Sequence, residues 1–103
     1  MNIQEAHSDI RKFIESTDVV TRLKLARAIE LLSIEEYHLG IPYSRKIQKN
    51  LYELRIKSIQ NIRIFYTFYQ NTIVLLHIIS KKTQKLLSKD LSTARHRLGR
   101  LHS

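Results

Sequence analysis

The hydrophobic pattern changes near residue 50 from a helical spacing to an alternating one, and this change constrains the fold more than any other feature. From Leu51 to Lys57, apolar residues alternate with charged ones, as in a half-buried strand. Ile62 to Tyr69 is rich in β-branched and aromatic residues, and Ile73 to Ser80 is apolar on both faces, as in a central strand. Because the connections are short, we expect a three-stranded antiparallel meander.

Helical spacing flanks this sheet on both sides. A short helix is expected from about Ser8, and a longer one after N-cap candidates at residues 16–18, until Gly40 and Pro42 end it. A last helix is expected from Ser88, with a stripe of apolar residues on one side. The order ααβββα predicts one α+β domain over residues 1–103, with its helices packed on one face of the sheet.

Positive charge is concentrated in the predicted sheet and last helix. Of the 18 Lys and Arg residues, ten lie in residues 51–103, where there are only two acidic residues. Residues 1–50 carry eight basic and seven acidic residues and are nearly neutral. This asymmetry favours an anionic partner that is met by the second half of the chain, although a basic surface that serves solubility alone gives the same count.

Composition excludes several kinds of chemistry. The chain has no Cys, and its five His and nine acidic residues show no metal-binding spacing, so neither a metal site nor any other cofactor is expected. Neither a signal peptide nor an apolar run long enough to cross a bilayer is present, so we expect a cytoplasmic protein without membrane contact. Nucleic-acid cleavage by this chain would therefore have to proceed without metal.

A set of cations on or beside the three strands is the candidate site. The chemistry it suits is RNA cleavage, in which the ribose 2′-oxygen attacks the adjacent phosphate. Arg and Lys would stabilise the charge on phosphorus, and a His, a Tyr or a Lys of lowered pKa would move protons. The residues concerned are Arg55, Lys57, Arg63, His77, Lys81, Lys82 and Lys85, with Tyr66 and Tyr69 between them.

Each of these residues also has a structural interpretation. Arg55 and Lys57 fit the solvated face of an amphipathic strand, and His77 fits a hydrogen-bonded core histidine. Strand parity separates the candidates, since Arg55 and Arg63 share a face only if an odd number of residues connects their strands. A two-residue turn in the next hairpin would place His77 on the face of the sheet opposite to that of Arg63. Arg55 and Arg63 therefore rank above His77 as candidates.

Four segments resemble the RelE/ParE toxin superfamily, and most closely its HigB-like, phage-derived branch. The segments are LYELR from Leu51, IRIFY from Ile62, IVLLHIISKKTQK from Ile73, and Ala94 followed by Arg95. The resemblance implies a RelE-like α+β fold with a curved antiparallel sheet. Such proteins usually begin with a strand, so the sheet would have three strands, or four if Met1 to Ile3 form a short one.

The resemblance also implies a function. Many such toxins are ribosome-dependent mRNA endoribonucleases of type II toxin–antitoxin modules, which need no metal and inhibit translation. By position, Arg55, Arg63 and Lys82 would be catalytic, and Lys81 and Lys85 would be supporting RNA contacts. We add His77 as the weakest catalytic candidate, and Lys57 and Arg95 as further RNA contacts. The implied partners are ribosome-bound mRNA and a helix-turn-helix antitoxin, through which the toxin would meet operator DNA.

Two alternatives remain open within this superfamily. One is a catalytically degenerate protein that only binds its antitoxin and operator DNA. The other is a ParE-like toxin that acts on DNA gyrase, because a shared fold does not decide the target.

Overall fold

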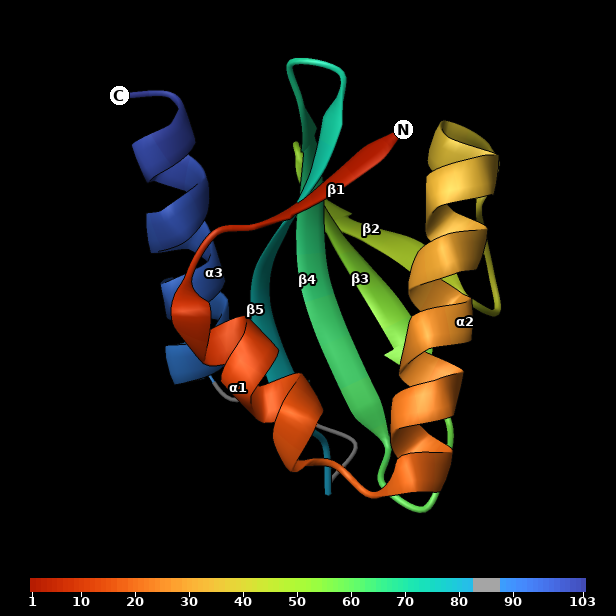
Figure 1. The fold of residues 1–103 in the computed structure, drawn as a ribbon. Coiled ribbons are helices and arrows are strands. Elements are labelled where there is room, and N and C mark those ends of the chain that lie inside the picture. The colour runs from red at the N-terminus through yellow and green to blue at the C-terminus, as the bar shows by residue number, and fades with distance from the viewer. Residues whose placement is uncertain (83–87) are drawn as a thin grey trace.

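The computed structural model describes residues 1–82 and 88–103. Its elements are, in order, β1 (Asn2–Glu5), α1 (Ser8–Ser16), α2 (Val19–Glu35), the 3₁₀ helix η1 (Glu36–His38), β2 (Ser44–Gln48), β3 (Leu51–Ile56), β4 (Ile62–Tyr69), β5 (Thr72–Ser80) and α3 (Ser88–Leu101). The predicted α+β class is confirmed (Figure 1). Within the described residues, no helix combines the length and the apolar character needed to cross a membrane.

The sheet has five strands in the order β1-β5-β4-β3-β2, so the expected three or four strands were too few. β1 is the short N-terminal strand, and it pairs parallel to β5, which makes the sheet mixed and not purely antiparallel. β2 pairs antiparallel with β3, with Ser44 opposite Leu54. Sequence reasoning missed β2 because its residues SRKIQ show no alternating apolar pattern; pairing with β3 defines this edge strand.

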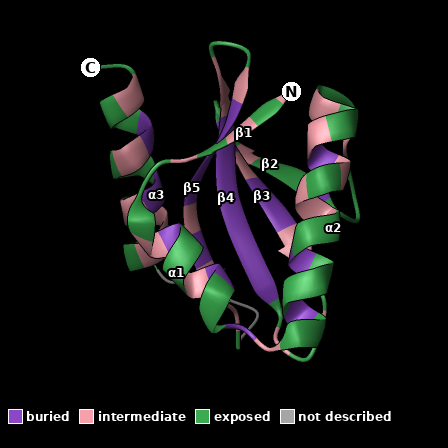
Figure 2. Cartoon of the chain, viewed as in Figure 1, coloured by how far each residue is buried: buried purple, intermediate pink, exposed green. Residues whose placement is uncertain are grey.

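Helices cover both faces of the sheet, which corrects the expectation that they pack on one face only. α1 and α2 cross one face (Figure 1), where Ile10 and Leu25 meet the side chains of Leu54 and Ile64. α3 packs on the opposite face, in a second apolar cluster with Leu51, Phe65, Val74, Leu76, Ala94 and Leu98. β4 lies between these two cores and is buried along most of its length (Figure 2).

The turn between β4 and β5 is a tight two-residue connection. Gln70 and Asn71 have φ values of 48° and 58°, as the two central residues of a type I′ hairpin turn require. Tyr69 consequently pairs with Thr72. This register, continued along both strands, would place His77 on the face opposite Arg63, as strand parity predicts.

A β-bulge reverses that outcome. The register shifts by one residue after the Tyr66–Leu75 pair, so the next pair is Phe65 with His77 and Leu76 is the extra residue. His77 therefore lies on the same face as Phe65, and that face also carries Arg63. The bulge could not be inferred from the apolar run of β5, in which every register buries hydrophobic side chains.

The sequence predicted the start of α2 correctly but placed its end too late. Asp18, one of the expected N-cap candidates, accepts a hydrogen bond from the backbone N–H of Thr21 at 2.9 Å. The C-terminal end comes earlier than Gly40 and Pro42, because the chain leaves the helix at Glu36, where φ is 54°. The 3₁₀ helix η1 follows this residue directly.

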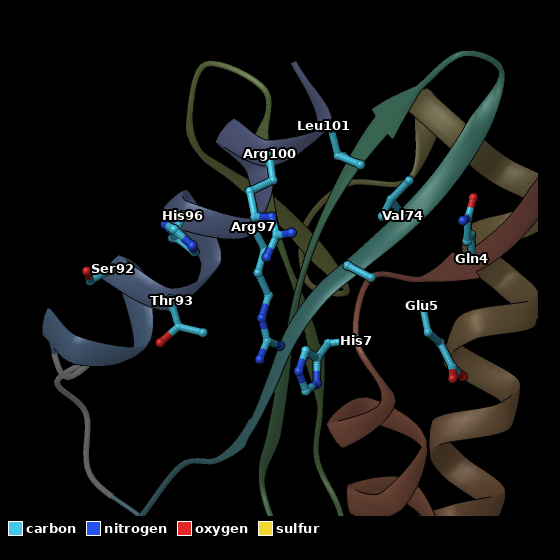
Figure 3. A pocket seen from close by; sticks show the side chains of 11 residues that line it. Gln4, Glu5, His7, Val74, Ser92, Thr93, His96, Arg97, Arg100 and Leu101 are labelled. Atoms are coloured by element: carbon cyan, nitrogen blue, oxygen red, sulfur yellow. The ribbon is translucent and has the colours of Figure 1, made fainter. Parts of the chain in front are cut away.

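Arg97 ties α3 to the start of α1. Its guanidinium donates to both carboxylate oxygens of Asp9, at 3.0 and 2.6 Å, and to the carbonyl of Leu76 at 2.9 Å. Figure 3 shows Arg97 extending from α3 toward His7, the N-cap of α1, whose Nδ1 accepts from the Asp9 N–H. Ser8, where the short helix was expected to begin, is the first residue of α1 and not its cap. Arg97 thus joins three elements that are distant in sequence.

We expect Arg97→Met to lower the free energy of unfolding by about 2 kcal/mol at pH 7, because charge-assisted hydrogen bonds are lost from a largely buried guanidinium. The Arg97 hydrogen bond holds the pKa of Asp9 below its ordinary 3.8. This part of the stabilisation is complete above pH 3.8 and is lost as the pH falls through the lowered pKa. Urea unfolding at pH 7 and pH 3 should therefore show a smaller effect at pH 3.

Arg100→Met is the matched control, since Arg100 lies on the same helix and lines, together with Arg97, the pocket drawn in Figure 3. We expect it to change stability by less than about 0.5 kcal/mol. Equal losses in the two variants would contradict a specific role for Arg97.

Candidate nucleic-acid interface

A buried carboxylate surrounded by cations forms the candidate site. The Glu53 side chain in β3 is 0% exposed, and one of its oxygens, Oε1, lies 3.2 Å from Arg45 Nε, 3.6 Å from Arg55 Nε and 3.8 Å from Arg63 Nε. We call these four residues together with Lys81 the Glu53 cluster. Three arginines contact one carboxylate and Lys81 adds a fourth positive charge nearby, so the cluster has an excess of positive charge on the sheet face that α3 also occupies.

Pairing of β3 with β4 brings two predicted residues together. Arg55 lies directly opposite Arg63, and the two share a face because the connection between their strands, residues 57–61, holds an odd number of residues. Arg63 is buried, with its side chain 8% exposed, and its Nη1 donates to the carbonyl of Ile62 at 3.1 Å. Arg55 is 35% exposed and reaches solvent more freely.

Sequence reasoning missed two members of the cluster, Arg45 and Glu53. Arg45 comes from β2, where it lies opposite Glu53, and it makes the hydrogen bond of 3.2 Å to that carboxylate. Glu53 is one of the charged residues that alternate with apolar ones in the predicted half-buried strand, yet it is fully buried. Glu53 and Arg55 are two residues apart in the alternating strand, which places both on one face. This spacing was the sequence signal that could have linked Glu53 to the site. For Arg45 the local sequence held no signal, because β2 was not predicted.

Burial and crowding of like charges lower two pKa values in the cluster. The pKa of Arg63 is lowered chiefly by burial, against which the Glu53 carboxylate acts. The pKa of Lys81 is lowered by burial and then by the positive charge of Arg63. Lys81 follows β5 directly, and its backbone N–H donates to the carbonyl of Asn61 at 2.7 Å, which fixes its position beside the start of β4.

His77 lies on the same sheet face as the Glu53 cluster, but its side chain contacts residues outside the cluster. Its Nε2 lies 3.0 Å from Asp90 Oδ1 at the start of α3, and its ring stacks on Phe65 with centroids 6.2 Å apart. Both the His77 and the Asp90 side chains are largely buried. This geometry connects β5 to the first turn of α3, and a catalytic role for His77 stays a prediction.

Of the four remaining predicted cations, the structure describes three, Lys57, Lys82 and Arg95. Lys82 is exposed next to Lys81. Lys57 follows β3 beside α2, since Lys24 Nζ lies 3.4 Å from its carbonyl oxygen. Arg95 on α3 donates through Nε to Gln48 Oε1 at 2.7 Å and so reaches the strand that carries Arg45. Lys85 lies outside the described residues.

A cleft of about 820 Å³ lies apart from the cluster, between α3 and the segment that joins β1 to α1 (Figure 3). Its charged groups are largely paired: Arg97 binds Asp9, and Glu5 binds Arg11. The Glu53 cluster, with its excess of positive charge, is therefore the better candidate for an anion such as RNA.

The five-stranded sheet with helices on both faces is compatible with the RelE-like fold of small toxins. The chain belongs to the family of phage-derived Gp49-like proteins (DUF891), a RelE-like toxin family whose model matches residues 12–99. No curated protein matches the sequence. The predicted superfamily is thus confirmed at the level of this family, and the family indicates an antitoxin as partner.

Proposed function

We propose that this protein is the toxin of a type II toxin–antitoxin module and that it cleaves mRNA on the ribosome. The observation that carries the proposal is the Glu53 cluster, in which Arg45, Arg55 and Arg63 contact a single buried carboxylate on one sheet face and Lys81 adds a further positive charge. An open, cationic sheet surface suits an RNA strand, which presents a phosphate at every nucleotide. The HigB-like branch remains part of this proposal.

The proposed reaction uses a nucleophile that the RNA itself supplies. The 2′-oxygen forms a bond to the adjacent phosphorus as the bond to the 5′-oxygen breaks, and the products are a 2′,3′-cyclic phosphate and a free 5′-hydroxyl. The arginines stabilise the additional negative charge on the phosphoryl oxygens, since guanidinium groups match phosphate geometry. The proton of the 2′-hydroxyl passes to a base, and the 5′-oxygen takes up a proton.

Lys81 is the candidate for one of these proton transfers. Burial and the neighbouring Arg63 lower its pKa, which brings the ammonium closer to releasing a proton at neutral pH. We propose Lys82 as a further catalytic group, and Lys57, Lys85 and Arg95 as contacts to flanking phosphates. The antitoxin is proposed to be of the helix-turn-helix type and to carry the toxin to operator DNA.

The test adds the purified protein to a translating extract and maps the 5′ ends of the mRNA. We expect new ends that depend on active translation and carry 5′-hydroxyl groups, because the reaction leaves them. Intact mRNA in the presence of folded protein would contradict the proposal. Double-strand DNA breaks with intact mRNA would instead indicate a gyrase target, and an unaffected extract would indicate a degenerate toxin.

A further inference from the structure

We propose that Glu53 is a positioning residue, which orients the guanidinium groups of Arg45, Arg55 and Arg63 so that together they bind phosphate. The inference deepens the proposed function and takes its ligand class, phosphodiester oxygens, from it. It assigns a role to the one acidic side chain of the cluster and adds Arg45 to the phosphate-binding set.

Because the Glu53 side chain is buried, it acts through other residues and not by contact with a substrate. Its side chain is 0% exposed, so neither carboxylate oxygen can touch a substrate that lies on the sheet surface. Its second oxygen, Oε2, has no hydrogen-bond partner among the residues that the structure describes. A buried carboxylate with an unsatisfied oxygen is unfavourable unless strong charge interactions compensate it. The three arginines supply that compensation, and the carboxylate in turn constrains them.

The geometry of the contacts indicates how Glu53 orients the arginines. In all three, the ion-pair contact with Glu53 Oε1 is made by Nε, at 3.2 Å for Arg45, 3.6 Å for Arg55 and 3.8 Å for Arg63. The Arg45 contact is a hydrogen bond, whereas Arg63 Nε has no hydrogen-bond partner among the described residues and is held by charge alone. A guanidinium is planar and rigid, so an Nε–H edge that faces the carboxylate takes one terminal N–H with it and leaves the other terminal nitrogen on the far side. Arg45 and Arg55 are 49% and 35% exposed, so parts of both side chains remain accessible to a ligand.

A purely electrostatic role for Glu53 predicts the opposite effect on anion binding. If Glu53 only offset charge, its neutralisation would make the cluster more positive and anions would bind more tightly. If Glu53 positions the arginines, its neutralisation releases them and anions bind more weakly, because ordering the side chains must then accompany binding. The sign of the change therefore separates the two roles.

The experiment measures binding of inorganic pyrophosphate to the intact protein and to Glu53→Gln. Binding is followed through the arginine Nε–H signals in NMR spectra. We expect the dissociation constant to rise by about tenfold in Glu53→Gln, and the Nε–H signals of the three arginines to lose their dispersion. Unchanged or tighter binding, or no pyrophosphate binding by the wild-type protein, would overturn the proposal.

Two further variants keep the result interpretable. Glu5→Gln neutralises a carboxylate that pairs with Arg11 outside the cluster, and it should bind pyrophosphate as the wild type does. Because Glu53→Gln leaves three guanidiniums facing one another, the variant Arg45→Gln/Glu53→Gln removes one of them and is compared with Arg45→Gln. Weaker binding in the double variant, with both variants folded, supports positioning. Equal binding shows that Glu53 serves stability alone.

Cleavage of mRNA is measured on the same variants and separates this inference from the proposed function. A wild-type protein that binds pyrophosphate through these arginines without cleaving mRNA would refute the nuclease and leave the role of Glu53 standing. Cleavage by the wild type with undiminished pyrophosphate binding by Glu53→Gln would refute the role of Glu53 and leave the nuclease standing.

Discussion

Replacing Arg63 by lysine is expected to lower the rate of mRNA cleavage by about a hundredfold, which makes it the strongest single test of the proposed chemistry. The substitution keeps the positive charge but removes the planar fork that stabilises a phosphoryl group, and loss of one such donor costs about 10² in rate. The Arg63 side chain is buried opposite Arg55, pairs with Glu53 and donates to the carbonyl of Ile62, so the shorter reach of a lysine ammonium cannot be recovered by movement.

The measurement is the rate at which defined mRNA ends appear in a translating extract at several toxin concentrations. Affinity for RNA should change less than the rate, because the net charge is the same. Arg11→Lys provides the control, since Arg11 also pairs with a glutamate but lies outside the cluster. Cleavage by Arg63→Lys within about twofold of the wild type would remove Arg63 from the proposed reaction.

Phe65→Ala is expected to destabilise the protein by about 3–5 kcal/mol, as is usual when a buried phenylalanine is truncated. Phe65 is 0% exposed and lies in the core between the sheet and α3, where its ring also stacks on His77. A loss of this size is a large fraction of the about 5–15 kcal/mol that stabilises a typical domain. Urea unfolding of the purified variant gives the free energy directly.

Phe65→Leu serves as the comparison, because it keeps most of the apolar volume and should cost less than about 1.5 kcal/mol. A loss below about 1 kcal/mol for Phe65→Ala would contradict the packing of α3 on this face of the sheet. Both variants should unfold with the same dependence on urea concentration if only stability has changed.

The parts of the fold that the sequence predicted well are those with a strong local pattern. The range of β4 and the start of α3 agree with expectation, as does the Asp18 cap, because alternation, apolar spacing and capping chemistry are local. β2 was not predicted, and neither was the packing of α3 on the second face of the sheet. Edge pairing of β2 depends on β3, and the side on which α3 packs depends on the complete sheet.

The candidate site divides in the same way. Arg55 and Arg63 were predicted because both lie on recognisable strands, and parity then placed them on one face. Arg45 depended on the unpredicted β2. Glu53 carries a charge, and a charged residue in an alternating strand is ordinarily assigned to solvent; only the convergence of three arginines makes its burial possible.

The tight turn and the bulge of the β4–β5 hairpin have a consequence for any change in the length of this segment. Together they determine which residues of β5 share a face with Arg63. The two-residue turn alone would place His77 on the opposite face, and the extra residue Leu76 returns it to the face of Arg63. Deleting Leu76 would remove the bulge, and His77 and every residue after it up to Lys81 would then move to the opposite face relative to Arg63. Variants of this hairpin should therefore tolerate an insertion or a deletion only when a second one compensates it.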